Sequence, residues 1–295
     1  MEAQIDRRGG TRPVSRPENE LSAAQRFLYS TGLGQLILKG ILIRPWVSRF
    51  AGWYMDSRLS TVHIKSFIRS SGIDMSPYPH RRYISFNDFF TRQICPEQRP
   101  VDSDPDALVA PCDGRLSAYR ILPDSSFLIK ETRYTLPGLL RSEELAAEFA
   151  GGLCLIFRLA VDNYHRYCYM DGGTEGESEF LPGCLHTVHP IALGVCDIYK
   201  ENAREYTVLH TDSFGDVVQM EVGALMVGRI CNHHRQGRFA RGEEKGMFQF
   251  GGSTIVLLLK KDIAEVDEEF FLNTAEGLET AVRMGERIGR SAAKS

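Results

Sequence analysis

The sequence predicts an α+β protein, in which an N-terminal helical segment precedes a β-rich domain of antiparallel sheets. Two observations support this fold class. Apolar residues recur at near-helical spacing between Leu21 and Phe67. From about Val101 onward, short segments rich in β-forming residues alternate with turns.

The same patterns divide the chain into three parts. We expect a frayed tail over residues 1–20, a helical segment over 21–100 and the β-rich domain over 101–295. Pro45 must kink or end one helix and begin another. The three leucines at 257–259 suggest a strand that is covered on both faces, and one short helix is expected near residues 142–150.

Composition excludes some classes of function. The chain has 295 residues, a net charge of −3 and a pI near 6.3, so no global basic field points to nucleic acid. Seven cysteines without a CxxC pair indicate a reducing compartment rather than a disulfide framework or a zinc site. The first twenty residues lack the apolar core of a signal peptide.

The stretch Leu33–Met55 is the most hydrophobic part of the chain, but lysine and arginine residues interrupt it. Such charges are costly at the centre of a bilayer, so we do not expect a spanning helix. Two alternatives remain. One is a helix pair packed on the main domain. The other is a helix in a membrane interface, with Trp46 and Trp53 at headgroup level and arginines facing anionic lipid.

Three segments carry polar residues that suggest chemistry. Asp113 lies in APCDGRLS, where an Asp-Gly pair alone is usually a turn. His165 follows an apolar strand in VDNYHRYCYMDGG, where an isolated histidine is more often a packing residue. His189 precedes a proline in LHTVHPIAL.

A fourth segment, KGMFQFGGSTIVLLL, places two glycines and a serine at the mouth of an apolar strand. Gly251 and Gly252 allow unusual backbone angles, which could bring the hydroxyl of Ser253 onto the preceding carbonyl. This geometry would favour attack by Ser253 on the Gly252 carbonyl. The simpler alternative is a plain β-bulge.

These segments occur together with FNDFFTR, RPVD, EVGALMVG and ETAVRMGERIG, in an order that resembles the phosphatidylserine decarboxylase family. The resemblance runs from about Ala51 to Gly289, and GGST after KGxFxF is its most specific part. The chain is most similar to the shorter bacterial form that ends in a GGST-type site.

The resemblance implies self-cleavage between Gly252 and Ser253, with Asp113 as the carboxylate of a serine-hydrolase-like triad. Ser253 would become a covalent pyruvoyl cofactor, and fragments 1–252 and 253–295 would stay associated. The pyruvoyl ketone would condense with the amine of phosphatidylserine and accept electrons as carbon dioxide leaves, which yields phosphatidylethanolamine. No metal is required. The implied partners are a phospholipid substrate and an anionic membrane surface, on the cytoplasmic face of the cell membrane.

The chain departs from the family at the triad base. Members usually carry a second histidine three residues after the first, where this chain has Cys168, and they tend to have asparagine where it has His189. A thiol with an ordinary pKa of about 8.5 is a poor proton relay. We favour His189 as the base for cleavage and His165 for the lipid chemistry, with the reverse assignment as the alternative.

Two other functions remain open from the sequence. Ser253 could be the nucleophile of a serine hydrolase that acts on an external acyl group, although GGST is not a nucleophile elbow. The chain could also be a non-catalytic lipid-binding homologue that lost activity through Cys168. Oligomeric state is left open, with a homodimer as one alternative.

Overall fold

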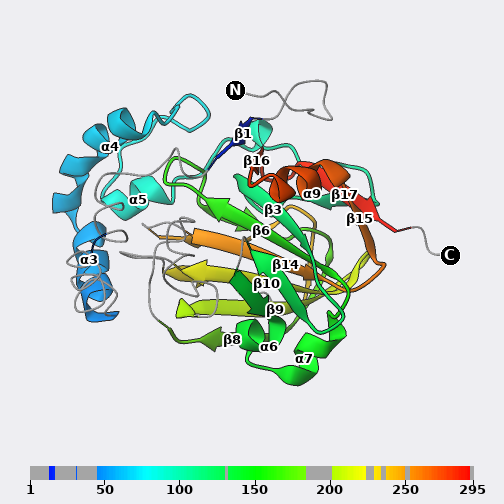
Figure 1. Ribbon diagram of the computed structural model, residues 1–295. Helices are drawn as coiled ribbons and strands as arrows, with labels where there is room; N and C mark the ends of the chain where they lie inside the picture. Colours follow the sequence, from blue (N-terminus) through cyan, green and yellow to red (C-terminus); the bar gives the residue numbers. More distant parts are fainter. Residues whose placement is uncertain are drawn as a thin grey trace.

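The computed structural model describes residues 13–16, 31, 45–129, 132–183, 201–223, 229–233, 237–249 and 253–292. In these parts of the chain, a flank of short helices precedes a large antiparallel sheet, on which smaller sheets and helices pack (Figure 1). The α+β fold class predicted from the sequence is confirmed.

The large sheet has nine strands in the order β1-β16-β3-β6-β14-β10-β9-β8-β12. Its strands, in chain order, are β1 (Val14–Ser15), β3 (Gly114–Arg120), β6 (Leu153–Leu159), β8 (Gly173–Leu181), β9 (Arg204–Thr211), β10 (Gly215–Gly223), β12 (Arg238–Phe239), β14 (Ser253–Leu259) and β16 (Glu279–Val282). Every neighbouring pair is antiparallel, so chain ends from several strands meet at each end of the sheet.

Strand β14 is the centre of the hydrophobic core. All seven of its residues are buried, and it pairs with β6 on one side and β10 on the other. Ile255 and Leu257 face one core cluster, whereas Val256 and Leu258 face another. The prediction of a strand covered on both faces is therefore confirmed.

Different elements cover the two faces of the sheet. The face of Val256 packs against two short helices and a hairpin. These are α6 (Leu136–Leu140), α7 (Glu143–Glu148), β4 (Ser126–Ile129) and β5 (Thr132–Thr135). Helix α7 starts where the side chain of Ser142 accepts a hydrogen bond from the Leu145 amide at 3.2 Å, which confirms the short helix expected there.

The face of Ile255 packs against two three-stranded sheets and helix α9 (Glu268–Ala275). One small sheet consists of β11 (Ile230–Asn232), β13 (Glu244–Phe248) and β7 (Arg166–Cys168). The other consists of β15 (Ala264–Val266), β17 (Arg287–Ser291) and β2 (Ala107–Val109).

The N-terminal segment is helical, as predicted. Its elements are α3 (Pro45–Asp56), the 3-10 helix η3 (Arg58–His63), α4 (Ile64–Ser71), α5 (Phe86–Phe90) and the 3-10 turn η4 (Pro96–Gln98). Pro45 begins a helix, a position that suits its fixed φ and missing N–H. A cluster around Phe86, Phe89 and Phe90 joins α3, α4 and α5. Within the described part of the chain, no helix is long and apolar enough to cross a membrane.

One expectation for the N-terminal tail needs correction. Val14 and Ser15 lie within the stretch 1–20, for which we expected a frayed tail, but they form β1 and pair with Thr280 and Glu279 of β16. The pairing uses backbone groups, so neither residue carries a sequence pattern that would reveal it. The domain limits at residues 20 and 100 remain predictions.

Candidate active site

Strands β3 and β14 begin, and strands β6 and β10 end, at the same edge of the large sheet. Strand β14 begins at Ser253, which pairs with Leu159 at the end of β6 and with Gly223 at the end of β10. Strand β3 begins at Gly114, where an added Cβ would lie 3.0 Å from the Arg158 carbonyl oxygen of β6. Asp113 precedes β3 and is thus two strands from Ser253, or about 10 Å at the usual strand spacing.

Ser253 occupies an unusual position for a serine. Its side chain is fully buried, and its Oγ has no hydrogen-bond partner among the described residues. By strand alternation it lies on the face of Ile255 and Leu257, beneath the small sheet that contains β7 and β13. Leaving a buried hydroxyl unsatisfied costs about 1–3 kcal/mol, so such a group suggests a functional site.

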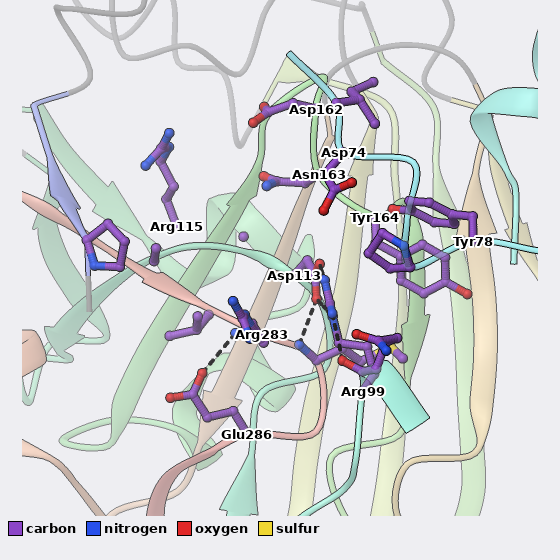
Figure 2. Close-up of a pocket in the computed structure, with 18 of the residues that line it drawn as sticks. Asp74, Tyr78, Arg99, Asp113, Arg115, Asp162, Asn163, Tyr164, Arg283 and Glu286 are labelled. Atoms are coloured by element: carbon purple, nitrogen blue, oxygen red, sulfur yellow. Dashed lines mark hydrogen bonds and ion pairs between the residues drawn. The ribbon is translucent and has the colours of Figure 1, made fainter. Parts of the chain in front are cut away.

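Asp113 is held by a group to which the sequence analysis assigned no role. Arg99 donates from Nε to Oδ1 at 2.7 Å and from Nη2 to Oδ2 at 2.5 Å, and the Met284 amide donates to Oδ1 at 2.9 Å (Figure 2). Both side chains of this ion pair are largely buried. The only sequence signal for Arg99 was its place in the RPVD segment.

His165 is a neutral imidazole with one free nitrogen. Its Nδ1 lies 2.9 Å from the Asn163 carbonyl oxygen, which can only accept, so Nδ1 carries the proton. Its Nε2 is buried and has no partner among the described residues. The ring packs on Phe90 of α5 at 4.1 Å between centroids. Burial lowers the pKa of His165 to about 3, which keeps the ring neutral at pH 7.

The predicted site residues are only partly brought together. The hydrogen bonds to the Asp113 side chain within the described chain come from Arg99 and Met284, and none comes from His165. Cys168 lies beside the Asp113 turn, where its amide donates to the Pro111 carbonyl at 2.8 Å. Burial raises the pKa of Cys168 to about 12, which makes it a poor base. Gly252 and His189 lie outside the described residues.

A cavity of about 680 Å³ opens beside Asp113. It is bounded by the chain after α4, the Arg99 loop, the start of β3, the loop after β6 and the loop after β16 (Figure 2). Its charged lining includes Asp74, Asp162, Arg115 and Arg283. Because charges of both signs face the cavity, it suits a polar ligand that itself carries both signs.

Comparison with known proteins identifies the family. Residues 86–290, more than half of the chain, match the model of the phosphatidylserine decarboxylase family. The chain belongs to this family. The phosphatidylserine decarboxylase proenzyme 2 of Clostridium acetobutylicum is 44% identical over 90% of this chain and 91% of its own length. The phosphatidylserine decarboxylase proenzyme of Ruminiclostridium cellulolyticum is 40% identical over 89% of each chain.

Membership confirms the resemblance noted in the sequence. The matched residues include Asp113, His165 and Ser253. Both relatives are named as proenzymes.

The neutral His165 should make stability depend on pH. Its folded pKa near 3 lies below the unfolded value of about 6.5, so the unfolded state binds more protons between these limits. The contribution of His165 to the free energy of unfolding is therefore complete at pH values above about 6.5. It falls by about 1.4 kcal/mol per pH unit as the pH drops from there towards 3. Between pH 6.5 and 5.0, we expect the parent to lose about 2 kcal/mol more than His165→Phe.

The measurement is urea unfolding of both proteins in a Ser253→Ala background, so that the covalent state of the chain is the same in each. Equal losses for parent and variant would contradict a neutral, buried His165.

Proposed function

We propose that this protein is a proenzyme that cuts itself between Gly252 and Ser253, converts Ser253 into a pyruvoyl group, and then decarboxylates phosphatidylserine to phosphatidylethanolamine. The observation that carries the proposal is the buried Oγ of Ser253 at the start of β14, which has no hydrogen-bond partner in the described part of the chain. Family membership supports the same conclusion, since the relatives are named as phosphatidylserine decarboxylase proenzymes.

Burial of Ser253 also argues against a serine hydrolase. A serine that attacks an external acyl group must be reached by that group, but the Ser253 side chain is fully buried. The carbonyl of its own preceding residue is attached to it by one peptide bond. The buried position therefore favours an intramolecular target.

The self-cleavage balances without a further reactant except water. Ser253 Oγ bonds to the carbonyl carbon of Gly252, the bond from that carbon to the Ser253 nitrogen breaks, and the hydroxyl proton moves through a base to the nitrogen. Loss of the Ser253 Cα proton and of the Cβ–Oγ bond then releases Gly252 as a carboxylate. The remaining dehydroalanine takes up water and loses ammonia, which leaves the ketone.

The residues present fit the pyruvoyl group. The Oγ of Ser253 is the atom that the cleavage consumes, and it is buried on the face where Tyr167 of β7 and Phe248 of β13 pack against Ile255 and Leu257. Once formed, the group supplies a ketone that binds the substrate amine and accepts the electron pair released with carbon dioxide. The Nε2 atom of His165 is a buried acceptor without a partner among the described residues, and the ring packs on Phe90.

We assign the base for self-cleavage to His189. A general base works best with a pKa near the working pH, and the pKa of His165 near 3 makes it too weak to take the Ser253 proton. Asp113 retains room for such a partner, because a carboxylate has about four acceptor positions and three are filled. His165 would then serve the lipid chemistry.

The cavity beside Asp113 is the proposed headgroup site. The serine headgroup carries an ammonium, a carboxylate and a phosphate, and the cavity offers both carboxylates and guanidinium groups. Arg115 and Arg283 would face the anionic groups, and Asp74 and Asp162 the ammonium.

We place membrane attachment, on the cytoplasmic face of the cell membrane, on the helical flank. Phe50 and Trp53 of α3 are 65% and 68% exposed, and Leu59 and Val62 of η3 are 73% and 72% exposed. Exposed apolar side chains that gather in this way mark interaction surfaces. Helix α5 of this flank contacts the candidate active site, because its Phe90 packs on His165. A membrane bound to the flank would therefore lie near the place where the lipid headgroup reacts.

The first test concerns the cleavage itself. The wild-type chain should yield fragments 1–252 and 253–295, and the smaller should carry a blocked N-terminus without serine. Ser253→Ala should remain whole and lose at least a thousandfold in decarboxylation, because it lacks the attacking oxygen. Denaturing mass spectrometry and a phosphatidylserine assay measure both. An intact wild-type chain that still decarboxylates the lipid would refute the pyruvoyl mechanism.

The second test separates the two histidines. His189→Ala should slow cleavage by about 100-fold or more, since general bases typically contribute 10² to 10⁴ in rate. His165→Ala should cut itself but lose turnover per pyruvoyl group. Cleavage is followed by gel and turnover is normalised to the amount of cut protein. Wild-type cleavage by His189→Ala would return the triad role to His165.

The third test addresses the helical flank. Replacing both Trp53 and Val62 by alanine should weaken binding to phosphatidylserine-containing vesicles by about tenfold, because their apolar area no longer enters the membrane. Wild-type binding should fall with salt. Leu272→Ala on α9, at a side chain that is 60% exposed, is the matched control and should bind like wild type. Unchanged binding of the double variant would place the attachment elsewhere.

A further inference from the structure

A buried ion pair joins the small sheet to the large one on the Ser253 face. Lys245 of β13 and Glu221 of β10 are both fully buried. The Nζ atom of Lys245 donates to both Glu221 carboxylate oxygens at 3.0 Å and to Asn232 Oδ1 at 3.2 Å. These contacts use all three ammonium hydrogens.

The backbone around Lys245 is shaped for this contact. Strand β13 pairs with β7 at Glu244 and Gly246, and a β-bulge lies between them at Lys245. A bulge redirects a side chain relative to a regular strand. A Cβ added at Gly246 would lie 2.5 Å from the Cys231 carbonyl oxygen and 2.7 Å from the Tyr167 hydroxyl, so the backbone packs directly on this network.

The network also reaches the strand that follows His165. The Tyr167 hydroxyl of β7 donates to Asn232 Oδ1 at 2.9 Å. The Asn232 amide in turn donates to Glu221 at 3.0 Å and to Glu205 at 2.8 Å. Strands β7, β9, β10, β11 and β13 are therefore tied to one pair of buried charges.

The position of the pair relates it to Ser253. Gly223 of β10 is the register partner of Ser253, and Glu221 lies two residues further along the same face. Diagonal neighbours of this kind lie about 7–8 Å apart, and no hydrogen bond joins Glu221 to Ser253 among the described residues. Lys245 belongs to the last strand before the cleavage position, and Ser253 begins the first strand after it. Strand β10 thus anchors the chain on both sides of the Gly252–Ser253 bond.

We propose that Lys245 and Glu221 are positioning residues for self-cleavage, which hold the chain before Gly252 against the strand that begins at Ser253. The inference rests on the proposed function. A buried ion pair is weak evidence for stability, since apolar replacements of similar volume are often neutral or stabilising. Its directional bonds instead fix where β13 lies, and a shift of about 1 Å in a reacting group can cost 100-fold in rate.

The test uses the double variant Lys245→Met with Glu221→Leu, which leaves no unpaired buried charge. In a cell-free translation time course, it should cut itself about 100-fold more slowly than wild type while its thermal unfolding midpoint stays within a few degrees. Protein that has been cut should show wild-type kcat and KM per pyruvoyl group, because the pair does not contact the substrate. A merely structural defect would lower the unfolding midpoint and the turnover together.

The matched control removes a second, largely buried ion pair, which lies near the start of β10 rather than near its end. Asp171 pairs with Arg241 at 2.8 Å, and Asp171 also accepts from the Ser213 amide beside the start of β10. The double variant Asp171→Leu with Arg241→Met should cut itself within about twofold of wild type. If the variant Lys245→Met with Glu221→Leu does not fold, Lys245→Met with Glu221→Gln, which keeps the shape of the Glu221 side chain and leaves no unpaired charge, is scored in the same way.

The outcomes are distinct. A folded Lys245 variant that cuts at the wild-type rate would overturn the positioning role and leave the proposed function intact. Equal slowing in the control pair would also overturn it, since the effect would then follow from any lost ion pair. An uncut wild-type chain would overturn both proposals.

Discussion

The site is built around one constraint, a hydroxyl that is buried at the first position of the central strand and has no partner within the described ranges of the chain. Strand β14 is buried along its whole length, so Ser253 cannot turn towards solvent to satisfy its Oγ. Leaving this hydroxyl unsatisfied costs about 1–3 kcal/mol of folding free energy. Burial of each large apolar side chain that follows in β14 stabilises the fold by about 1.5–3 kcal/mol and offsets this cost. The core therefore keeps the Ser253 hydroxyl buried at a fixed place.

The same dry environment governs the charges nearby. Asp113 is paired with Arg99, Glu221 with Lys245 and Glu279 with Arg158. An unpaired charge at such positions would cost several kcal/mol. His165 avoids the cost of a buried charge in another way, because its low pKa keeps the ring neutral where it packs on Phe90. The site thus combines fixed ion pairs with two neutral groups, the Ser253 hydroxyl and the His165 imidazole.

The structural features that could be predicted from the sequence are those that depend on a local pattern of residues. The triple leucine indicated a strand covered on both faces, and the helix near residue 142 begins at a serine cap. Asp113 and Ser253 were singled out by the resemblance to the family, because their neighbouring glycines alone indicated no more than a turn and a β-bulge. The pairing of Arg99 with Asp113 could not be predicted, because it depends on how a loop folds over the start of β3. The ion pair between Lys245 and Glu221 likewise depends on a β-bulge at Lys245, which no local sequence pattern predicts.

The topology also bears on what a cut at Ser253 would do. Residues 253–292 supply β14, an internal strand of the large sheet between β6 and β10, and β16, which lies between β1 and β3. Seven register pairs join β14 to each neighbour, so breaking one peptide bond at its start would leave the sheet intact. On the proposed pathway the two fragments stay folded together for this reason.

The topology further explains why a cut would be needed before the lipid reaction. Ser253 is fully buried, so an external headgroup could reach this position only after a rearrangement, and a cut between Gly252 and Ser253 would create a new chain end there. Cleavage would free that chain end while Lys245 still ties β13 to β10. The new N-terminal group would remain at the start of a rigid strand rather than on a loop, which is the placement that holds a reactive group in a defined geometry.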